Sequence, residues 1–245
     1  MADKRRADQL LVDRGLAESR AQAQSFILAG AVHTVDRRIE KPGVLLATDA
    51  SLSVRRAARF VSRGGEKLDA ALDALTVDVQ GALAVDLGAS TGGFTDCLLQ
   101  RGARHVYAVD VGRAQLADKL RRDARVTVME GVNARHLSRD AFGLVPELVT
   151  VDASFISLVK LLPAIHAIVS DAGRCLALIK PQFEVGRDAA RRARGVIRDP
   201  EQRRAAIDQV LEAIQKAGFE VLGECPSALP GPKGNREHFV LFRRA

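Results

Sequence analysis

Four charged residues stand beside apolar segments of the sequence, namely Lys67, Asp152, Lys180 and Glu237. Burying an unpaired charge next to such segments would be costly, so these residues should either pair with one another or remain at a surface. A lysine held by carboxylates can orient a hydroxyl group and accept its proton. Each residue alone is equally typical of a surface ion pair, so the prediction of an acid–base site requires the fold to bring them together.

A glycine-rich segment, 88–94, follows the predicted strand 83–87 and precedes a predicted helix that begins at Thr95. Such a turn at the carboxyl end of a first strand binds nucleotide-bearing ligands. The dinucleotide fingerprint would need glycine at position 90, which is Ser90 here. S-adenosylmethionine has no phosphate to cradle, so this open turn favours that cofactor over a dinucleotide.

The predicted cofactor contacts lie in the turn and at the ends of the first two strands. They are Asp86, Gly88, Ser90, Thr91, Gly92, Gly93, Phe94 and Asp110. The last of these ends the second strand, where a carboxylate can accept hydrogen bonds from both hydroxyls of a ribose.

Regular alternation of strands and helices is needed to position these groups. Apolar, strand-like runs occur at 83–87, 105–109, 126–129, 148–151 and 175–179, separated by segments long enough for helices. This pattern predicts an α/β fold, a doubly wound parallel sheet with helices on both faces. The residues that follow its strands, including Asp152 and Lys180, should then meet at the carboxyl edge of the sheet.

The first sixty residues follow a different pattern. Two helical segments within 5–29 are separated by Ser19, a predicted N-cap, and end at Gly30; short strands at 32–35, 44–46 and 52–54 follow and suggest a hairpin. We therefore predict a small basic α+β domain over 1–59, a linker at 60–63, and the doubly wound domain over 64–245.

The composition limits the classes of molecule that the protein is expected to bind. A net charge of +7 attracts polyanions such as a nucleic acid, whereas 4% aromatic residues argue against many stacked bases. Cys97, Cys175 and Cys225 have no metal-ligand spacing, so they are expected to be buried small side chains with no metal site. No apolar run is long enough for a membrane span and the start is not signal-like, so we expect a cytoplasmic protein, as a monomer.

Two stretches of the sequence resemble known families. Residues 6–20 and 29–32 resemble the RNA-binding module named after small-subunit ribosomal protein S-four, although its usual Asn-Gly turn is replaced by Val-Asp-Arg-Arg at 35–38. From Val61-Ser-Arg-Gly-Gly-Glu-Lys through Asp86-Leu-Gly-Ala-Ser-Thr-Gly-Gly-Phe, Val151-Asp-Ala-Ser-Phe, Ile179-Lys-Pro-Gln-Phe-Glu and Gly234-Asn-Arg-Glu-His-Phe, the chain resembles the TlyA group of FtsJ-like methyltransferases, historically labelled haemolysin A.

This second resemblance implies a function and a site. It implies methyl transfer from S-adenosylmethionine to a ribose 2′-hydroxyl of ribosomal RNA within ribosomal subunits, with cytidine as the target. It also implies that Lys67, Asp152, Lys180 and Glu237 serve as a Lys-Asp-Lys-Glu tetrad, and that Asn133, after the third strand, lies in the cofactor site.

The predicted RNA contacts are basic residues in both parts of the chain. In the first sixty residues they are Arg5, Arg6, Arg14, Arg20, Arg37, Arg38 and Lys41. Further along, the arginine-rich segment with Arg191, Arg192 and Arg194 is expected to form a loop that closes on RNA. Two alternatives stay open, a catalytically silent RNA-binding protein and a membrane-active haemolysin, although the latter lacks the long apolar or lysine-edged amphipathic helix it would need.

Overall fold

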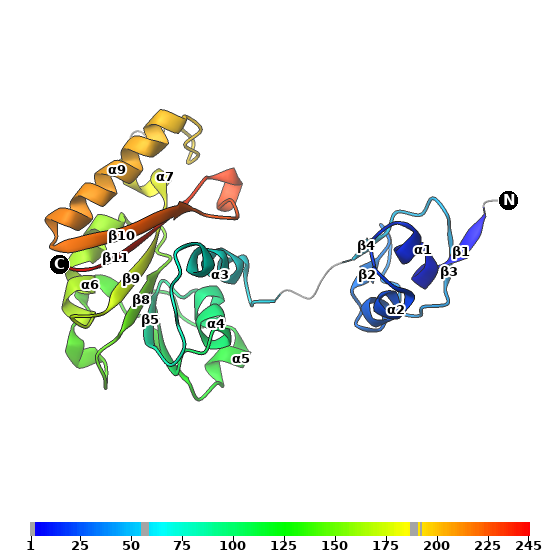
Figure 1. Ribbon diagram of the computed structural model, residues 1–245, viewed down its shortest axis with the longest axis horizontal. Coiled ribbons are helices and arrows are strands. Elements are labelled where there is room, and N and C mark those ends of the chain that lie inside the picture. The colour runs from blue at the N-terminus through cyan, green and yellow to red at the C-terminus, as the bar shows by residue number, and fades with distance from the viewer. Residues whose placement is uncertain (1–2, 55–58, 187–190, 192) are drawn as a thin grey trace. The chain divides into compact units, whose positions relative to one another are not determined.

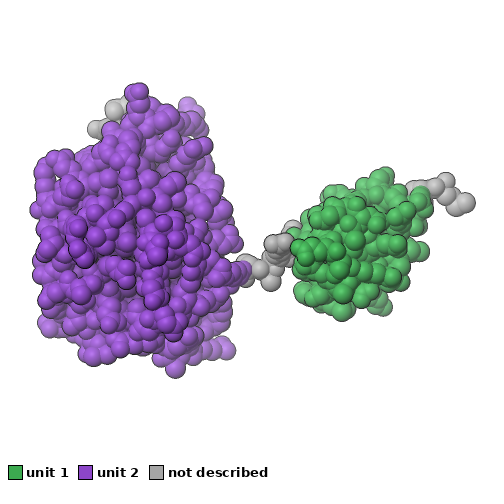
Figure 2. Space-filling view, viewed as in Figure 1, with its two compact units in different colours: residues 1–58 green, residues 59–245 purple. Residues whose placement is uncertain are grey.

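The computed structural model describes residues 3–54, 59–186, 191 and 193–245. The chain divides into two compact units, residues 1–58 and 59–245 (Figure 2). Residues 60–63, predicted as a linker, belong to the second unit instead. Phe60 is buried against Gly65, and the Val61 N–H donates to Asp96 at 2.8 Å. Burial of one aromatic ring thus fixes this segment to the larger core.

The helices of the first unit match the sequence pattern closely. Helix α1 spans Ala7–Asp13 and α2 spans Arg20–Leu28. Ser19 caps α2 by accepting a hydrogen bond from the Gln22 N–H at 3.2 Å, and Gly30 follows with a φ of +70°. The predicted N-cap and helix stop are therefore confirmed.

The strands of the first unit pair differently from the predicted hairpin. β1 (Lys4–Arg6) pairs antiparallel with β3 (Leu45–Ala47), and β2 (Val32–His33) pairs antiparallel with β4 (Ser53–Val54). A short antiparallel turn does form at the predicted place, since His33 bridges Arg38 and the Ile39 N–H donates to the Val32 carbonyl at 2.8 Å. The following strand β3, however, pairs with β1, which is too short to show periodicity. Small apolar residues from both helices and the strands make a separate core around Leu11 and Ile27.

The second unit is built on a seven-stranded sheet. Its strands are β5 (Leu83–Leu87), β6 (His105–Asp110), β7 (Val126–Glu130), β8 (Leu148–Val151), β9 (Arg174–Ile179), β10 (Phe219–Pro226) and β11 (His238–Arg244). The order is β10-β11-β9-β8-β5-β6-β7, in which β11 runs against its neighbours. All five predicted strands are present, and the doubly wound α/β prediction is confirmed.

Helices cover both faces of this sheet (Figure 1). On one face lie α3 (Arg63–Ala74), α4 (Gly93–Gln100) and α5 (Asp118–Arg121); on the other lie α6 (Leu162–Ile168) and α9 (Pro200–Lys216). Shorter helices are α7 (Pro181–Glu184), η1 (Ala134–His136), η2 (Arg139–Ala141), η3 (Leu158–Leu161) and η4 (Pro232–Gly234). Each face has its own apolar core, and Cys97 and Cys175 are buried in them as expected, one on each face.

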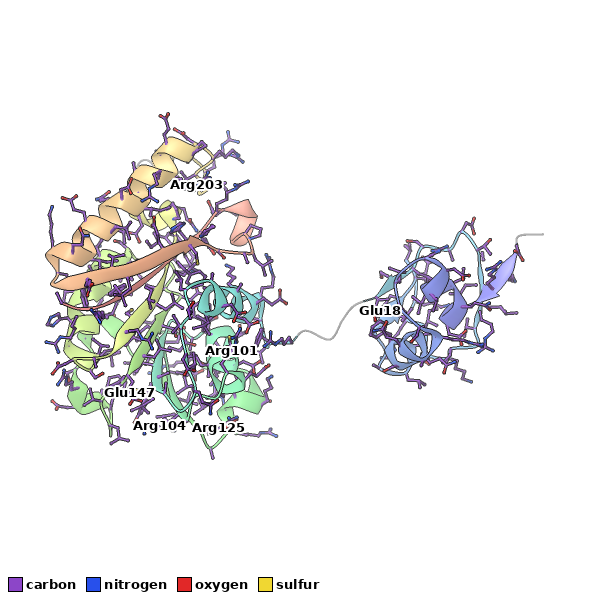
Figure 3. The ribbon with its side chains drawn as sticks, viewed as in Figure 1. Glu18, Arg101, Arg104, Arg125, Glu147 and Arg203 are labelled. Carbon is purple, nitrogen blue, oxygen red and sulfur yellow. The ribbon has the colours of Figure 1, made fainter. Side chains whose placement is uncertain are left out.

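The edge of the sheet at the amino ends of the parallel strands carries different residues from the edge at their carboxyl ends. At the amino ends of the strands, Arg104 and Glu147 lie side by side at the lower edge of the second unit in Figure 3 and pair at 3.3 Å. Glu147 also accepts from the N–H of Leu83, the first residue of β5, at 2.8 Å. The opposite edge, where β5 and its neighbours β6 and β8 end, carries the predicted site residues, as expected at a point where strand order reverses.

Candidate active site

The glycine turn between β5 and α4 closes tightly on the end of β8. Gly88 has a φ of +88°, and a Cβ on it would lie 2.7 Å from the carbonyl oxygen of Asp152. Gly92 has a φ of +95°, and a Cβ there would lie 2.3 Å from a methyl carbon of Leu120. Both positions therefore exclude side chains for two reasons at once, conformation and space.

Asp86, predicted as a cofactor contact, is wholly buried beneath this turn. Its carboxylate accepts from the Thr95 N–H at 3.0 Å, the Thr95 hydroxyl at 2.7 Å and the Thr150 hydroxyl at 3.3 Å. Burial raises the pKa of Asp86 to about 7, with the nearby charge of Asp152 acting in the same direction and the threonine hydrogen bonds opposing it. The structure thus assigns Asp86 to the support of the turn, because its side chain points between the sheet and α4.

A cavity of about 420 Å³, here called the β6 cleft, opens beside the turn. Of the predicted cofactor residues, Gly88, Ser90, Asp110 and Asn133 line it. Asp110 accepts from the backbone N–H groups of Ser90 at 2.8 Å and Gly112 at 2.7 Å. The remaining lining includes Gly112, Gln115 and Ile156, which the sequence analysis did not select because a glycine, an uncharged amide and an apolar side chain carry little chemical signal.

Glu130, at the end of β7, holds the loop that borders the β6 cleft. Its carboxylate accepts from the backbone N–H groups of Ala114, Gln115 and Leu116, at 2.9 to 3.3 Å, and from Arg121 at 2.7 Å. The Arg121 hydrogen bond, aided by these N–H donors, lowers the pKa of Glu130 to about 2. Sequence reasoning missed this residue, whose only signal was an acidic side chain at a strand end.

The four charged residues meet in a second cavity of about 570 Å³, here called the tetrad cleft. They form two ion pairs: Lys67 Nζ lies 2.5 Å from Glu237 Oε2, and Lys180 Nζ lies 2.6 Å from Asp152 Oδ1. Both lysines and Glu237 are buried. Thr91, Gly93 and Phe94 of the glycine turn line the same cleft. The tertiary structure therefore brings all four predicted residues together.

Two further features complete the tetrad cleft. Glu237 lies against Gly231, where a Cβ would come within 2.1 Å of Glu237 Oε1. That oxygen is buried and receives no hydrogen bond from the described part of the chain, so an acceptor remains for a ligand. On the other pair, Lys180 Nζ also donates to the hydroxyl of Ser154 at 2.8 Å.

A third and larger cavity, about 950 Å³ and here called the outer cleft, shares Lys180, Glu237 and Ser154 with the tetrad cleft. Phe155 lines it with 92% of its surface exposed and a φ of +64°, and its ring centroid lies 5.3 Å from that of Phe183. Positive φ is unusual for a bulky residue and often marks a functional site. Besides Lys180, the cationic lining residues are Arg135, Lys160 and Lys233, none of which the sequence analysis selected.

Two of the predicted RNA-contacting residues of the first unit, Arg6 and Arg20, bind one buried carboxylate. Asp8 accepts from Arg6 and Arg20, each at 3.0 Å, and from Gln24 at 2.9 Å. Arg6 and Arg20 keep 42% and 57% of their side-chain surface exposed. The Arg6 hydrogen bonds hold the pKa of Asp8 well below its usual range. Two guanidinium groups are thus fixed in position yet still open to a ligand.

The other predicted RNA contacts vary in their surroundings. Arg5 pairs with Asp13 at 2.8 Å, Arg38 pairs with Glu40 at 3.4 Å, and Arg14 donates to the carbonyl groups of Thr48 and Ala50. Arg37 and Lys41 are exposed. In the second unit Arg191 and Arg194 are exposed as well, while Arg192 lies outside the described residues.

Two kinds of structure are absent from the described residues. Among 3–54, 59–186, 191 and 193–245, no helix has both the length and the apolar character needed to cross a membrane. The same part of the chain holds no cluster of three or more histidine, cysteine, aspartate or glutamate side chains suited to a metal ion.

The chain is similar to known proteins along nearly its whole length. The chain is 44% identical over 247 residues to the 16S/23S rRNA (cytidine-2′-O)-methyltransferase TlyA of Mycobacterium tuberculosis, which covers 99% of this chain and 91% of that protein. It is 37% identical to hemolysin A of Brachyspira hyodysenteriae, covering 97% of this chain and 99% of that protein. A solved haemolysin-type protein from Streptococcus thermophilus aligns with a TM-score of 0.75 at 39% identity, covering 100% of this chain and 90% of that one. The FtsJ-like methyltransferase model matches residues 60–244, and the chain therefore belongs to that family.

Proposed function

We propose that this protein transfers a methyl group from S-adenosylmethionine to a ribose 2′-hydroxyl of ribosomal RNA, with cytidine as the target nucleotide. The observation that carries the proposal is the pairing of two buried lysines with two carboxylates in one cleft, between a nucleotide-sized cleft and an outer, cation-lined one. The relative from M. tuberculosis is named for this reaction, and the family is that of FtsJ-like methyltransferases.

The residues at the glycine turn fit S-adenosylmethionine. Gly88 leaves no side chain between the turn and the end of β8, and Asp110 uses only part of its hydrogen-bonding capacity on Ser90 and Gly112. We assign Gly88, Ser90, Asp110 and Asn133 to the adenosine part, and Thr91, Gly93 and Phe94 to the amino-acid part. When bound, the cofactor supplies an electrophilic methyl group on its sulfonium.

The tetrad acts on the hydroxyl that receives the methyl group. Lys180, once it has released one proton to solvent and is a neutral amine, orients the ribose hydroxyl and takes up its proton, and Asp152 fixes the position of Lys180 Nζ through the 2.6 Å contact. Lys67 and Glu237 line the same cleft, and the free Oε1 of Glu237 accepts a hydrogen bond from the substrate. Correct placement of the hydroxyl supplies much of the rate enhancement in such a transfer.

The basic residues of both units bind the RNA. Arg6 and Arg20, held by Asp8, contact phosphates together with the neighbouring Arg5, Arg14, Arg37, Arg38 and Lys41. In the second unit the outer cleft receives the target nucleotide, with Arg135, Lys160 and Lys233 near its backbone and the exposed ring of Phe155 available for stacking. Arg191 and Arg194, together with Arg192 outside the described residues, add phosphate contacts.

Three finer points accompany this proposal. The substrate is ribosomal RNA within ribosomal subunits, which places the protein in the cytoplasm. A monomer suffices, because all four tetrad residues come from one chain. The positive charge at the site comes from two lysines, so we assign no metal ion to the reaction.

A transfer assay with mapped product tests the function. The protein is incubated with tritiated S-adenosylmethionine and with small subunits, large subunits and naked ribosomal RNA from cells that lack this protein. We expect label at one or a few cytidines and resistance of the adjacent phosphodiester to alkaline hydrolysis, which a 2′-O-methyl group causes. Label on a base would overturn the 2′-O assignment; cofactor binding without label on any RNA would favour a catalytically silent RNA-binding protein.

A further inference from the structure

Ser154 occupies a special place among the clefts. It is the second residue after Asp152, and it lines the β6 cleft, the tetrad cleft and the outer cleft alike. Its hydroxyl accepts a hydrogen bond from Lys180 Nζ at 2.8 Å. A serine hydroxyl at this point therefore touches the reactive lysine and faces every cavity through which a ligand would reach it.

The contacts of Lys180 show what this hydroxyl does. An ammonium group has three hydrogens and no lone pair, so Lys180 can accept the hydroxyl proton only after it has released one of its own to solvent. Its Nζ lies 2.6 Å from Asp152 Oδ1 as an ion pair and donates one hydrogen to Ser154 Oγ. Within the described residues no third acceptor lies in hydrogen-bonding reach of Lys180 Nζ. Two fixed partners therefore leave a single direction in which the nitrogen can meet a substrate hydroxyl.

Contacts between the segments that follow Ser154 and Lys180 hold these two residues in fixed relative positions. The loop that follows Ser154 is tied to helix α7, directly after Lys180, because the Leu158 N–H donates to Glu184 Oε1 at 2.9 Å. Burial raises the pKa of Glu184, which marks this contact as an internal one. The rings of Phe155 and Phe183 add a second link between the same two segments. These links fix the backbone that carries the exposed residue Ser154 relative to the segment that follows Lys180.

We propose that Ser154 is a positioning residue of the active site, which aims Lys180 Nζ at the target ribose hydroxyl. This inference rests on the proposed function, since it assigns a direction to the proton acceptor of that reaction. Asp152 supplies the charge that keeps the lysine in the cleft, and Ser154 supplies the second, neutral point that fixes its orientation. A single ion pair without Ser154 leaves the nitrogen free to rotate about the Asp152 contact.

The test compares Ser154→Ala and Ser154→Thr with the unaltered full-length protein. Loss of a hydrogen bond to a charged group should lower kcat about tenfold or more in Ser154→Ala, while Ser154→Thr, which keeps the hydroxyl, stays within about threefold. KM for S-adenosylmethionine and KM for RNA should change less than about twofold, because no binding contact is assigned to this hydroxyl.

Controls separate a positioning role from a structural one. Ser170→Ala, before β9 and thus at the opposite edge of the sheet, should leave kcat unchanged. Equal losses of kcat in Ser154→Ala and Ser154→Thr, or a loss confined to KM, would overturn the proposal. In addition, the ¹⁵N NMR signal of the Lys180 ammonium in the protein without substrate should show faster hydrogen exchange in Ser154→Ala than in the unaltered chain.

The NMR measurement distinguishes a failure of the proposed function from a failure of the positioning role of Ser154. If the unaltered protein methylates no RNA, the proposed function fails, while the NMR signal still decides whether Ser154 holds Lys180. If the unaltered protein is active and Ser154→Ala matches it in kcat and in hydrogen exchange, the positioning role is refuted and the proposed function stands.

Discussion

The two units differ in how far they bury the cations of their ion pairs. In the first unit the carboxylate of Asp8 is buried and its cationic partners are about half exposed, with 42% and 57% of the Arg6 and Arg20 side chains accessible. In the second unit the cations Lys67 and Lys180 are themselves buried, with 9% and 8% accessible. Exposed guanidinium groups can bind phosphates with little loss of hydration, whereas buried ammonium groups act at short range on one substrate atom. The difference separates charge used for binding from charge used for chemistry.

Two buried carboxylates sharpen the same contrast. Asp8 is surrounded by two arginines and a glutamine, and its pKa lies well below the usual value. Asp86 is equally buried but has only hydroxyl and backbone N–H donors, and its pKa is raised to about 7. Burial alone therefore does not decide the charge of a carboxylate; the nature of its partners does.

The largest effect is expected for Lys180→Met, which removes one of the two buried lysines of the second unit. Removing the buried cation should lower kcat at least about 1000-fold, because positioned proton transfer contributes on the order of 100- to 10,000-fold. Affinities for S-adenosylmethionine and for RNA should stay within about threefold. Single-turnover methylation and calorimetric cofactor binding measure the two effects. Lys216→Met, an exposed lysine paired with Glu212 on α9, is the control that should remain fully active. Residual activity above a tenth would remove Lys180 from the mechanism.

The converse test removes exposed charge from the first unit. In the triple variant Arg37→Ala, Arg38→Ala and Lys41→Ala, RNA affinity should fall about 10- to 100-fold, and the slope of log affinity against log salt should decrease by up to about 3. At saturating RNA, kcat should be unchanged within about threefold. Fluorescence anisotropy over a salt series measures the slope. Arg104→Ala, Arg125→Ala and Lys216→Ala remove the same charge elsewhere; an equal loss in that control would mean that net charge alone binds RNA.

Asp8→Asn tests the buried anion of the first unit. Two arginines would lose their common partner, so helices α1 and α2 should lose about 1–3 kcal/mol of local stability. Because the pKa of Asp8 is lower in the folded state than in the unfolded one, its contribution is present at neutral pH and disappears as pH falls below about 4. Hydrogen exchange of the amides of both helices in the full chain measures this loss. Asp13→Asn, which breaks the surface pair with Arg5, should cost less than about 0.5 kcal/mol.

Asp86→Asn should show the smallest effect and the opposite pH dependence. The folded-state pKa of Asp86 is raised to about 7, so its protonated form favours folding at low pH, and this contribution is lost as pH rises toward and through 7. The natural chain should therefore lose about 1–2 kcal/mol between pH 6 and pH 8 relative to the variant. Urea unfolding followed by circular dichroism at both pH values provides the test. Identical pH dependence in the two proteins would refute the raised pKa.

Much of the fold could be predicted because its signals are local. The five parallel strands and the caps of α2 follow from runs of apolar residues, from Ser19 and from Gly30. The pairing of β1 with β3 could not be predicted, since a three-residue strand has no periodicity. The linker was misplaced because one phenylalanine, Phe60, packs into a core that begins later in the chain.

The site, like the fold, has some features that the sequence determines and others that only the tertiary structure decides. The sequence by itself determined the reacting groups, the glycine turn and the excess of positive charge, because these depend on residue type and on short spacing along the chain. Only the tertiary structure decided that Lys67 pairs with Glu237 and that Lys180 pairs with Asp152. It also decided that Asp86 supports the glycine turn. Finally, it placed Ser154 and Phe155 in the lining of the clefts. Lys67 and Glu237 are 170 positions apart, and their 2.5 Å contact exists only because α3 and β11 pack at the same edge of the sheet.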